Sequence, residues 1–346
     1  ASALRPARPA GRAQARLHRA PPDRAGSGPP EAATHPPLPP LPSSVTPDGV
    51  FLTSASKDGQ SMLRSGATGD WVGTFQGHKG ATWACALDAP ALRAATASAD
   101  FSARVWDAVT GDELATLTHA HIVRSVAFAG DGASLVTGGY EKLVRVFDLG
   151  APGAPPAVAL TAPDKIRRVE FGRDASGAAS PHVLHTTYID APGVGVWDLR
   201  AGAAVATIAT PSTVVSLEVT ADGRRLVTAD GSTARVWDAA TRAQVSEFPF
   251  AFAVESASLN PAGDRAVVGG EDMWVHFLDA ASGTELASLK GHHGPVHAVR
   301  WCPDGASFAS GSEDGTIRIW AMGGEAGGGG EAGGGGAAAA EGGAAA

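Results

Sequence analysis

Three observations predict an all-β fold built as a ring of similar four-stranded sheets. Short apolar runs alternate with Gly- and Asp-rich turns along most of the 346 residues, a pattern typical of strands and tight turns. An aromatic-Asp pair such as Trp106-Asp107 recurs at intervals of 40 to 50 residues, and an acid recurs six residues before it. A sheet of four short strands cannot bury both of its faces, so the repeats must pack on one another. Their period predicts a seven-bladed β-propeller.

The segment 77–107 shows one complete unit. Strands are expected at 82–87, 92–98 and 102–107, with a fourth at 113–117. Aligned on this unit, the aromatic position of the seven units holds Arg64, Trp106, Phe147, Trp197, Trp237, Leu278 and Trp320. The units accordingly span residues 46–76, 77–117, 118–162, 163–208, 209–248, 249–290 and 291–321.

Two of the units carry a fuller set of polar residues. These are His78, Asp100 and Trp106 in the second unit, and His292, Asp314 and Trp320 in the seventh. The units resemble WD repeats, in which such residues form a buried hydrogen-bond chain with a Ser or Thr of a strand. A buried polar network stabilises a fold only when every member is satisfied. We therefore expect the incomplete units, the fourth and fifth above all, to be looser.

The two ends of the chain lack the repeat pattern, which places the propeller at 43–321. Residues 1–42 are rich in Pro and Arg and are expected to be disordered. A transit peptide is the alternative, because Arg12, Arg16 and Arg19 could share a helical face. Residues 322–346 repeat Gly, Ala and Glu, a composition typical of a flexible tail. Since position 1 is Ala rather than Met, we expect a fragment, a processed form or the product of a doubtful gene model.

The first blade and the closure of the ring are expected to be incomplete. The innermost strand of the first unit would be missing or reduced to 43–45, and the seventh unit ends at Trp320, before its outermost strand. Residues 1–42 offer no strand to latch the two units together. Unpaired strand edges at this junction would invite aggregation or partner strands.

Composition narrows the class of function. A formal net charge of −8 argues against strong direct binding to a nucleic-acid backbone, and no apolar run is long enough for a membrane span. Cys85 and Cys302 lie on expected strands and are interpreted as core thiols rather than as a disulfide or metal site. No nucleophile elbow, phosphate loop or dinucleotide fingerprint is present. We therefore expect neither an enzyme nor a cofactor, and no small-molecule substrate.

Two pairs of histidines could be mistaken for metal ligands. They are His119 with His121, and His292 with His293. Neither pair has a third or fourth ligand at a matching spacing, and His292 already has a structural role. A metal site is therefore not predicted.

One position near the start of the innermost strand collects residues suited to binding. Stacking the units places there Trp83, Arg124, Arg167, Glu255 and His297. We expect this end of the strands to open on the wider mouth of the central channel. Trp and Arg are enriched among the residues that dominate protein interfaces. The position is therefore a candidate partner-binding patch, and an ordinary solvated rim is the competing interpretation.

Four segments carry a closer resemblance. They are Lys57–Arg64, Thr68–Ala81, Ala99–Leu114 and Gly291–Trp320. In these segments the chain is similar to the serine/threonine-kinase receptor-associated, or Unr-interacting, family of WD-repeat proteins. The resemblance covers residues 46–321 and includes Met62-Leu63-Arg64 in place of Trp-Asp. It departs at both ends, where the family's N-terminal strands and acidic C-terminal tail have no counterpart.

The resemblance implies a non-enzymatic adaptor of cytoplasm and nucleus. Family members join the survival-motor-neuron (SMN) complex with Gemin proteins, which loads Sm proteins onto spliceosomal small nuclear RNAs and so serves mRNA splicing. They also bind a cold-shock-domain RNA-binding protein, so that RNA is contacted only indirectly. Three alternatives stay open. These are a scaffold similar to subunit i of translation initiation factor 3, a kinase-receptor signalling adaptor, and a propeller enzyme.

Overall fold

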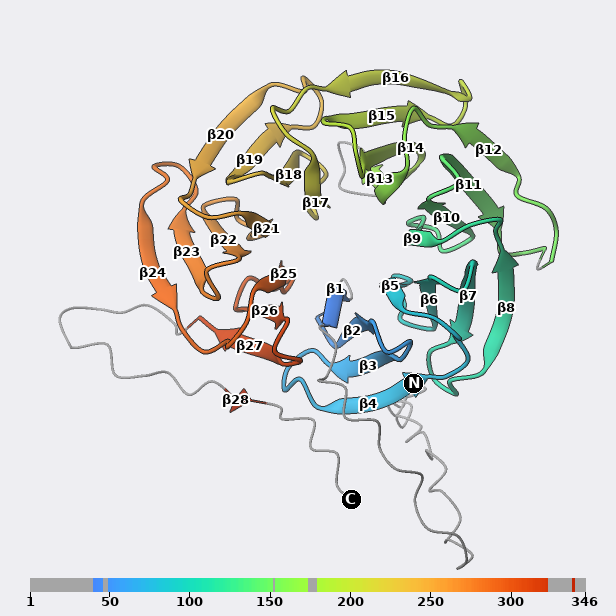
Figure 1. Ribbon diagram of the computed structural model, residues 1–346, viewed down its shortest axis with the longest axis horizontal. Coiled ribbons are helices and arrows are strands. Elements are labelled where there is room, and N and C mark those ends of the chain that lie inside the picture. The colour runs from blue at the N-terminus through green and yellow to red at the C-terminus, as the bar shows by residue number, and fades with distance from the viewer. Residues whose placement is uncertain (1–39, 46–48, 152, 174–178, 323–337, 340–346) are drawn as a thin grey trace, which may run out of the picture. The chain divides into compact units, whose positions relative to one another are not determined.

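The computed structural model describes residues 40–45, 49–151, 153–173, 179–322 and 338–339. In this part of the chain, seven antiparallel four-stranded sheets are arranged as blades in a ring (Figure 1). The predicted all-β, seven-bladed propeller is confirmed. The described residues include no helix with the length and hydropathy needed to cross a membrane.

The strands of each blade follow one another from the channel outward. Blade one contains β1 (Pro40–Val45), β2 (Phe51–Ser56), β3 (Ser61–Ser65) and β4 (Trp71–Phe75). Blade two contains β5 (Thr82–Leu87), β6 (Arg93–Ser98), β7 (Ser102–Asp107) and β8 (Glu113–Thr118). Blade three contains β9 (Val123–Phe128), β10 (Ser134–Gly139), β11 (Leu143–Asp148) and β12 (Val158–Thr161). Blade four contains β13 (Ile166–Arg173), β14 (Ala179–Tyr188), β15 (Val194–Asp198) and β16 (Ala203–Ile208).

The remaining blades repeat the same order. Blade five contains β17 (Val214–Val219), β18 (Arg225–Asp230), β19 (Thr233–Asp238) and β20 (Gln244–Pro249). Blade six contains β21 (Val254–Leu259), β22 (Arg265–Gly270), β23 (Val275–Asp279) and β24 (Glu285–Leu289). Blade seven contains β25 (Val296–Trp301), β26 (Ser307–Ser312), β27 (Ile317–Ala321) and the two-residue β28 (Ala338–Ala339).

The expectation of an incomplete first blade is wrong. The strand β1 begins at Pro40, three residues before the predicted start of the propeller, and pairs with β2 to complete a four-stranded sheet. It also contacts β25 of blade seven and β5 of blade two, so that it fills the junction between the first and last blades. The strand was not predicted because its prolines are unfavourable in strands and interrupt the strand pattern. They are tolerated because the innermost strand is an edge strand, whose channel side needs no ladder hydrogen bonds.

The fourth position of blade seven is also occupied, which corrects the second half of that expectation. The strand β28 pairs with β27, with Ala338 opposite Ile319 and Ala339 opposite Arg318. These two residues belong to the segment that composition alone assigned to a flexible tail. The remaining predicted terminal segments, 1–39 included, lie outside the described residues.

In six of the seven blades the second strand is almost wholly buried, because a neighbouring blade covers each of its faces. Near its end lies a small residue. A Cβ atom on Gly138 would lie 2.7 Å from Ile166 Cγ2 of the next blade, and one on Gly269 would lie 2.6 Å from Val296 Cγ1. The small residue lets the next inner strand approach closely. The other blades have Ala55, Ala97, Ala229 and Gly311 at this position, and blade four has Thr187.

The inner strands of adjacent blades are tied by serine hydroxyls. The backbone N–H of Val169 donates to Ser125 Oγ at 3.0 Å, and that of Val299 donates to Ser256 Oγ at 3.1 Å. These bonds satisfy backbone groups that face the neighbouring blade rather than their own sheet. They join the inner strands of blades three and four and those of blades six and seven.

In blade two the structure places the polar residues in one hydrogen-bond chain. His78 Nδ1 lies 2.8 Å from Asp100 Oδ2, and its Nε2 lies 2.7 Å from Thr96 Oγ1. Trp106 Nε1 donates to the same Thr96 oxygen at 2.8 Å. Burial lowers the pKa of His78, against the raising effect of Asp100. The ring is therefore neutral near pH 7, donating from Nδ1 to Asp100 and accepting at Nε2 from the Thr96 hydroxyl.

Blade seven has the same chain. His292 Nδ1 lies 3.2 Å from Asp314 Oδ2, and its Nε2 lies 2.7 Å from Ser310 Oγ. Trp320 Nε1 donates to Ser310 Oγ at 2.8 Å. Burial alone would raise the pKa of Asp314, but hydrogen bonds from the Thr316 side chain and from the backbones of His293 and Thr316, together with the charge interaction with His292, lower it to about 2.

Other blades keep part of the chain with different residues. In blade three, His119 Nε2 lies 2.9 Å from Thr137 Oγ1, which gives this histidine a structural hydrogen bond. In blade four, Trp197 Nε1 donates to Thr186 Oγ1 at 2.8 Å, and the Thr186 hydroxyl lies 3.1 Å from that of Tyr188. In blade four a tyrosine hydroxyl thus bonds the strand hydroxyl whose counterpart a histidine bonds in blades two and seven. The looser packing expected for the incomplete units stays a prediction.

Both cysteines are buried and are not joined by a disulfide. Burial raises the pKa of Cys302, so that its thiol is protonated at neutral pH. In the part of the chain that the structure describes, no group of three or more His, Cys, Asp or Glu side chains could hold a metal ion.

Candidate partner-binding site

The structure brings together all five residues that stacking of the units selected. Trp83, Arg124, Arg167, Glu255 and His297 line one cavity of about 80 Å³. Each is the second residue of its inner strand, and the inner strands converge on the channel. Residues at the same position of the inner strand in different blades therefore lie close together. Trp83 and His297 do so although more than 200 positions separate them in the chain.

The cavity has a strongly basic wall. The guanidinium carbon of Arg124 lies 3.9 Å from the centre of the Trp83 ring, a close cation–π stack. Arg167 follows on the next blade. Burial and the positive charge of Arg167 lower the pKa of Arg124 to about 10, which still leaves it charged at pH 7. Among the described residues, neither arginine forms an ion pair with a carboxylate.

The opposite wall is a charge pair. His297 Nδ1 lies 3.6 Å from Glu255 Oε2, and its Nε2 lies 3.6 Å from Glu313 Oε2. Interaction with Glu255 raises the pKa of His297, and interaction with His297 lowers the pKa of Glu255. The acidic charge on this side of the mouth is thus directed mainly at His297, although Arg167 also contributes to the lowered pKa of Glu255.

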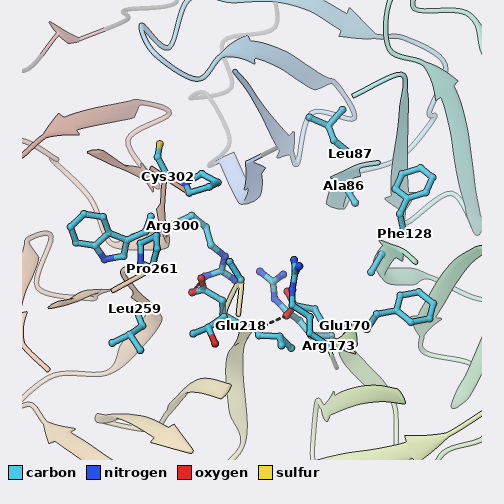
Figure 2. A pocket seen from close by; sticks show the side chains of 18 of the residues that line it. Ala86, Leu87, Phe128, Glu170, Arg173, Glu218, Leu259, Pro261, Arg300 and Cys302 are labelled. Atoms are coloured by element: carbon cyan, nitrogen blue, oxygen red, sulfur yellow. Dashed lines mark hydrogen bonds and ion pairs between the residues drawn. The ribbon is translucent and has the colours of Figure 1, made fainter. Parts of the chain in front are cut away.

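The sequence predicts these residues at the wider mouth of the channel, but the larger of the two cavities lies elsewhere. A cavity of about 300 Å³ lies at the other end of the inner strands, where sequence analysis selected no residues. Figure 2 shows this second cavity, with Arg300 and Glu218 pointing toward each other from blades seven and five.

The larger cavity contains buried charges of both signs. Arg300 Nη1 lies 3.6 Å from Glu218 Oε2, and Arg300 Nη2 donates to the Leu217 carbonyl at 3.2 Å. Burial raises the pKa of Glu218 to about 7, against the lowering effect of Arg300. Burial, with the positive charge of Arg300, lowers the pKa of Arg168 to about 10. Arg300 therefore links blade seven to blade five across the channel.

The sequence did contain a signal for this second cluster. The third and fifth residues of the inner strands face the channel, and most are Ala or Ser. In blades two to seven the exceptions are charged, namely Arg168, Glu170, Glu218 and Arg300. Aligning the units at the third and fifth residues of the inner strand, in the same way as at the second, identifies these four charged residues.

A row of aromatic rings at the same end of the blades as the small cavity also escaped sequence analysis. The rings of Phe101 and His121 lie 5.4 Å apart, and those of His121 and Tyr140 are stacked at 5.2 Å. Lys165 Nζ lies 5.6 Å from the centre of the Tyr140 ring. Phe101 is 45 % exposed. The residues come from turns of blades two, three and four, where no strand pattern marks them.

The comparisons with known proteins agree with this architecture. The family model described as WD domain, G-beta repeat matches residues 69–107, 111–148, 202–238 and 283–321. The chain is 46 % identical to the serine-threonine kinase receptor-associated protein of Gallus gallus, over 80 % of this chain and 77 % of that protein.

Two more distant relatives differ from each other in name. The protein of the same name from Dictyostelium discoideum is 40 % identical, over 80 % of this chain and 92 % of its own length. Eukaryotic translation initiation factor 3 subunit I of Culex quinquefasciatus is 28 % identical, over 79 % and 90 %. The resemblance inferred from the sequence segments is confirmed. The chain belongs to the serine-threonine kinase receptor-associated protein family of WD-repeat proteins.

Proposed function

We propose that the chain is a non-enzymatic adaptor that holds partner proteins at the small-cavity mouth of its channel. The observation that carries the proposal is the convergence of Trp83, Arg124 and Arg167 from consecutive blades into one cavity. Trp and Arg dominate the binding energy of many protein interfaces, because they combine large contact area with directed hydrogen bonds. The exposed ring of Phe101 and its neighbours extends this surface outward.

Family membership supports a specific setting for this adaptor. The proposed assembly is the SMN complex with its Gemin and Sm proteins, acting in spliceosomal small nuclear ribonucleoprotein assembly and hence in mRNA splicing, in cytoplasm and nucleus. A cold-shock-domain RNA-binding protein is proposed as a further partner, with RNA contacted only through partners. The net charge of −8 favours protein partners over a direct contact with the nucleic-acid backbone.

Two other functions have some support. The 28 % identity to initiation factor 3 subunit I makes a scaffold role in translation initiation the main alternative. The name of the more similar relatives suggests association with a kinase receptor. Each alternative predicts a different set of recovered partners, so one experiment separates them.

The test is affinity purification of the tagged chain from native extract at moderate salt, followed by mass spectrometry. Gemin and Sm proteins are expected. Recovery of initiation-factor subunits, or of a receptor kinase, would replace the proposal by the corresponding alternative.

A parallel purification tests the binding surface. The triple variant Trp83→Ala, Arg124→Ala, Arg167→Ala is expected to lose the partners. The matched control replaces Trp71, Arg200 and Arg224 by Ala, because these three are exposed elsewhere on the molecule. If the first triple variant retains every partner, this mouth is not the adaptor surface.

A further inference from the structure

The small cavity contains hydrogen-bond donors that lack acceptors. The Nε atoms of Arg124 and Arg167 and the Nε1 atom of Trp83 are buried, and none of them has a hydrogen-bond partner among the described residues. All three are donors only, since neither guanidinium nor indole can accept a hydrogen bond. A buried donor without an acceptor costs about 1–3 kcal/mol. A ligand that satisfies this cavity must therefore bring acceptor atoms.

The charges of the cavity restrict the ligand further. Arg124 and Arg167 lie on adjacent blades, and the charge of Arg167 disfavours the charged form of Arg124. The nearest acid on the cavity wall, Glu255, is directed mainly at His297. The two guanidinium groups therefore repel each other with little compensation. An anion between them would relieve the repulsion, whereas a cationic side chain would add to it.

The volume of the cavity limits the size of the anion that it can hold. A cavity of about 80 Å³ has room for roughly two to three water-sized groups, since each water takes about 30 Å³. This matches the end of a carboxylate side chain and lies well below the roughly 300 Å³ of ordinary small-molecule sites. The cation–π stack holds the plane of Arg124 against Trp83. A ligand can then approach the guanidinium group only along its edge, where the N–H groups point. Arginine binds carboxylates through this edge.

We infer that this cavity receives the carboxylate of an aspartate or glutamate side chain, presented by an acidic segment of a partner protein. The inference rests on the proposed adaptor function and names the chemistry that its site recognises. Arg124 and Arg167 bind the carboxylate from two blades. Trp83 positions Arg124 and supplies a further N–H donor.

The test begins with a display library of random twelve-residue peptides selected on the full chain. Selected peptides are expected to share an Asp or Glu, and replacing that residue by Asn or Gln should weaken binding about 10-fold or more. Arg124→Gln and Arg167→Gln should each cause a similar loss. Arg224→Gln, which changes an exposed arginine at the other end of the inner strands, should leave the dissociation constant unchanged. Selection of peptides without an acid, or equal binding by all variants, would overturn the inference.

A charge exchange guards against loss of folding. The Arg167→Glu variant should not bind the acidic peptide. It should bind a peptide in which Lys replaces the acid. Rescue requires a folded protein and direct contact, so its absence in a variant with unchanged circular dichroism counts against the inference.

Two further probes distinguish other anions. Phosphoserine in place of the peptide acid should not bind more tightly, and a twelve-nucleotide oligouridine should not compete with the peptide. A tenfold gain with phosphoserine, or competition by the RNA, would show that the cavity recognises phosphate instead. None of these measurements depends on which complex is purified from extract. Failure of the SMN assignment and failure of the carboxylate assignment can therefore be told apart.

Discussion

The shared hydroxyl of Thr96 offers a sharp test of what holds a blade together. Thr96 is fully buried and bonds both His78 Nε2, at 2.7 Å, and Trp106 Nε1, at 2.8 Å. Thr96→Val keeps the shape and removes the oxygen. The indole N–H and the imidazole nitrogen would then both lack partners in a buried site.

The expected loss follows from those two groups. Each buried polar atom left unsatisfied costs about 1–3 kcal/mol, so the two together should lower the free energy of unfolding by about 2–6 kcal/mol. For a domain of this size each kcal/mol lowers Tm by roughly 2–4 °C, which predicts a fall of about 4–24 °C. The assay is urea unfolding, followed by tryptophan fluorescence and by circular dichroism. Coincident transitions of the two signals justify a two-state fit.

Two further variants complete the design. Thr116→Val, on the exposed outer strand of the same blade, should stay within about 0.5 kcal/mol of the parent protein. The double variant Thr96→Val, Trp106→Phe should lose less free energy of unfolding than the two single variants together, because it has no indole N–H left without a partner. A loss below about 0.5 kcal/mol for Thr96→Val would refute the view that the hydrogen-bond chain stabilises the blade.

Gly138→Ala should lower the free energy of unfolding by about 1–3 kcal/mol in urea titrations, because the new Cβ would lie 2.7 Å from Ile166 Cγ2. The control is Gly73→Ala, because nothing lies within 4 Å of a Cβ at that position. An equal effect of the two substitutions would contradict the blade-packing argument. Burial and the charge of Arg242 lower the pKa of His185 to about 4, so between pH 6.5 and 4 the unfolded chain binds the extra proton and stability falls as pH falls. His185→Gln should therefore lose less stability than the parent between pH 7 and pH 5 in urea titrations, and an unchanged pH dependence would contradict this. The buried thiol of Cys302 should react with a thiol reagent at least about 100-fold more slowly in the folded protein than in urea, and rapid reaction of the folded chain would show that blade seven opens.

Much of the candidate site could be predicted from the sequence. The five residues at the small mouth were found because they occupy one phase of a repeated strand, and the ring brings equal phases together. The same reasoning applied to the third and fifth strand positions would have reached Arg168 and Glu218. The aromatic row could not be found this way, since turn residues such as Phe101 and Tyr140 follow no strand period.

The sequence by itself determined the fold class, the number of blades and the residues of the complete hydrogen-bond chains. These features recur in every unit or within one unit, so short-range periodicity records them. Tertiary structure alone decided how the ring closes, because β1 is recognisable only by its pairing with β2 and its contact with β25. It also decided that Tyr188 stands in for a histidine and that Arg300 reaches Glu218. It left Arg124 and Arg167 without an ion-paired acid among the described residues. These outcomes depend on distances and burial between segments that are far apart in the chain, and no local pattern encodes such distances.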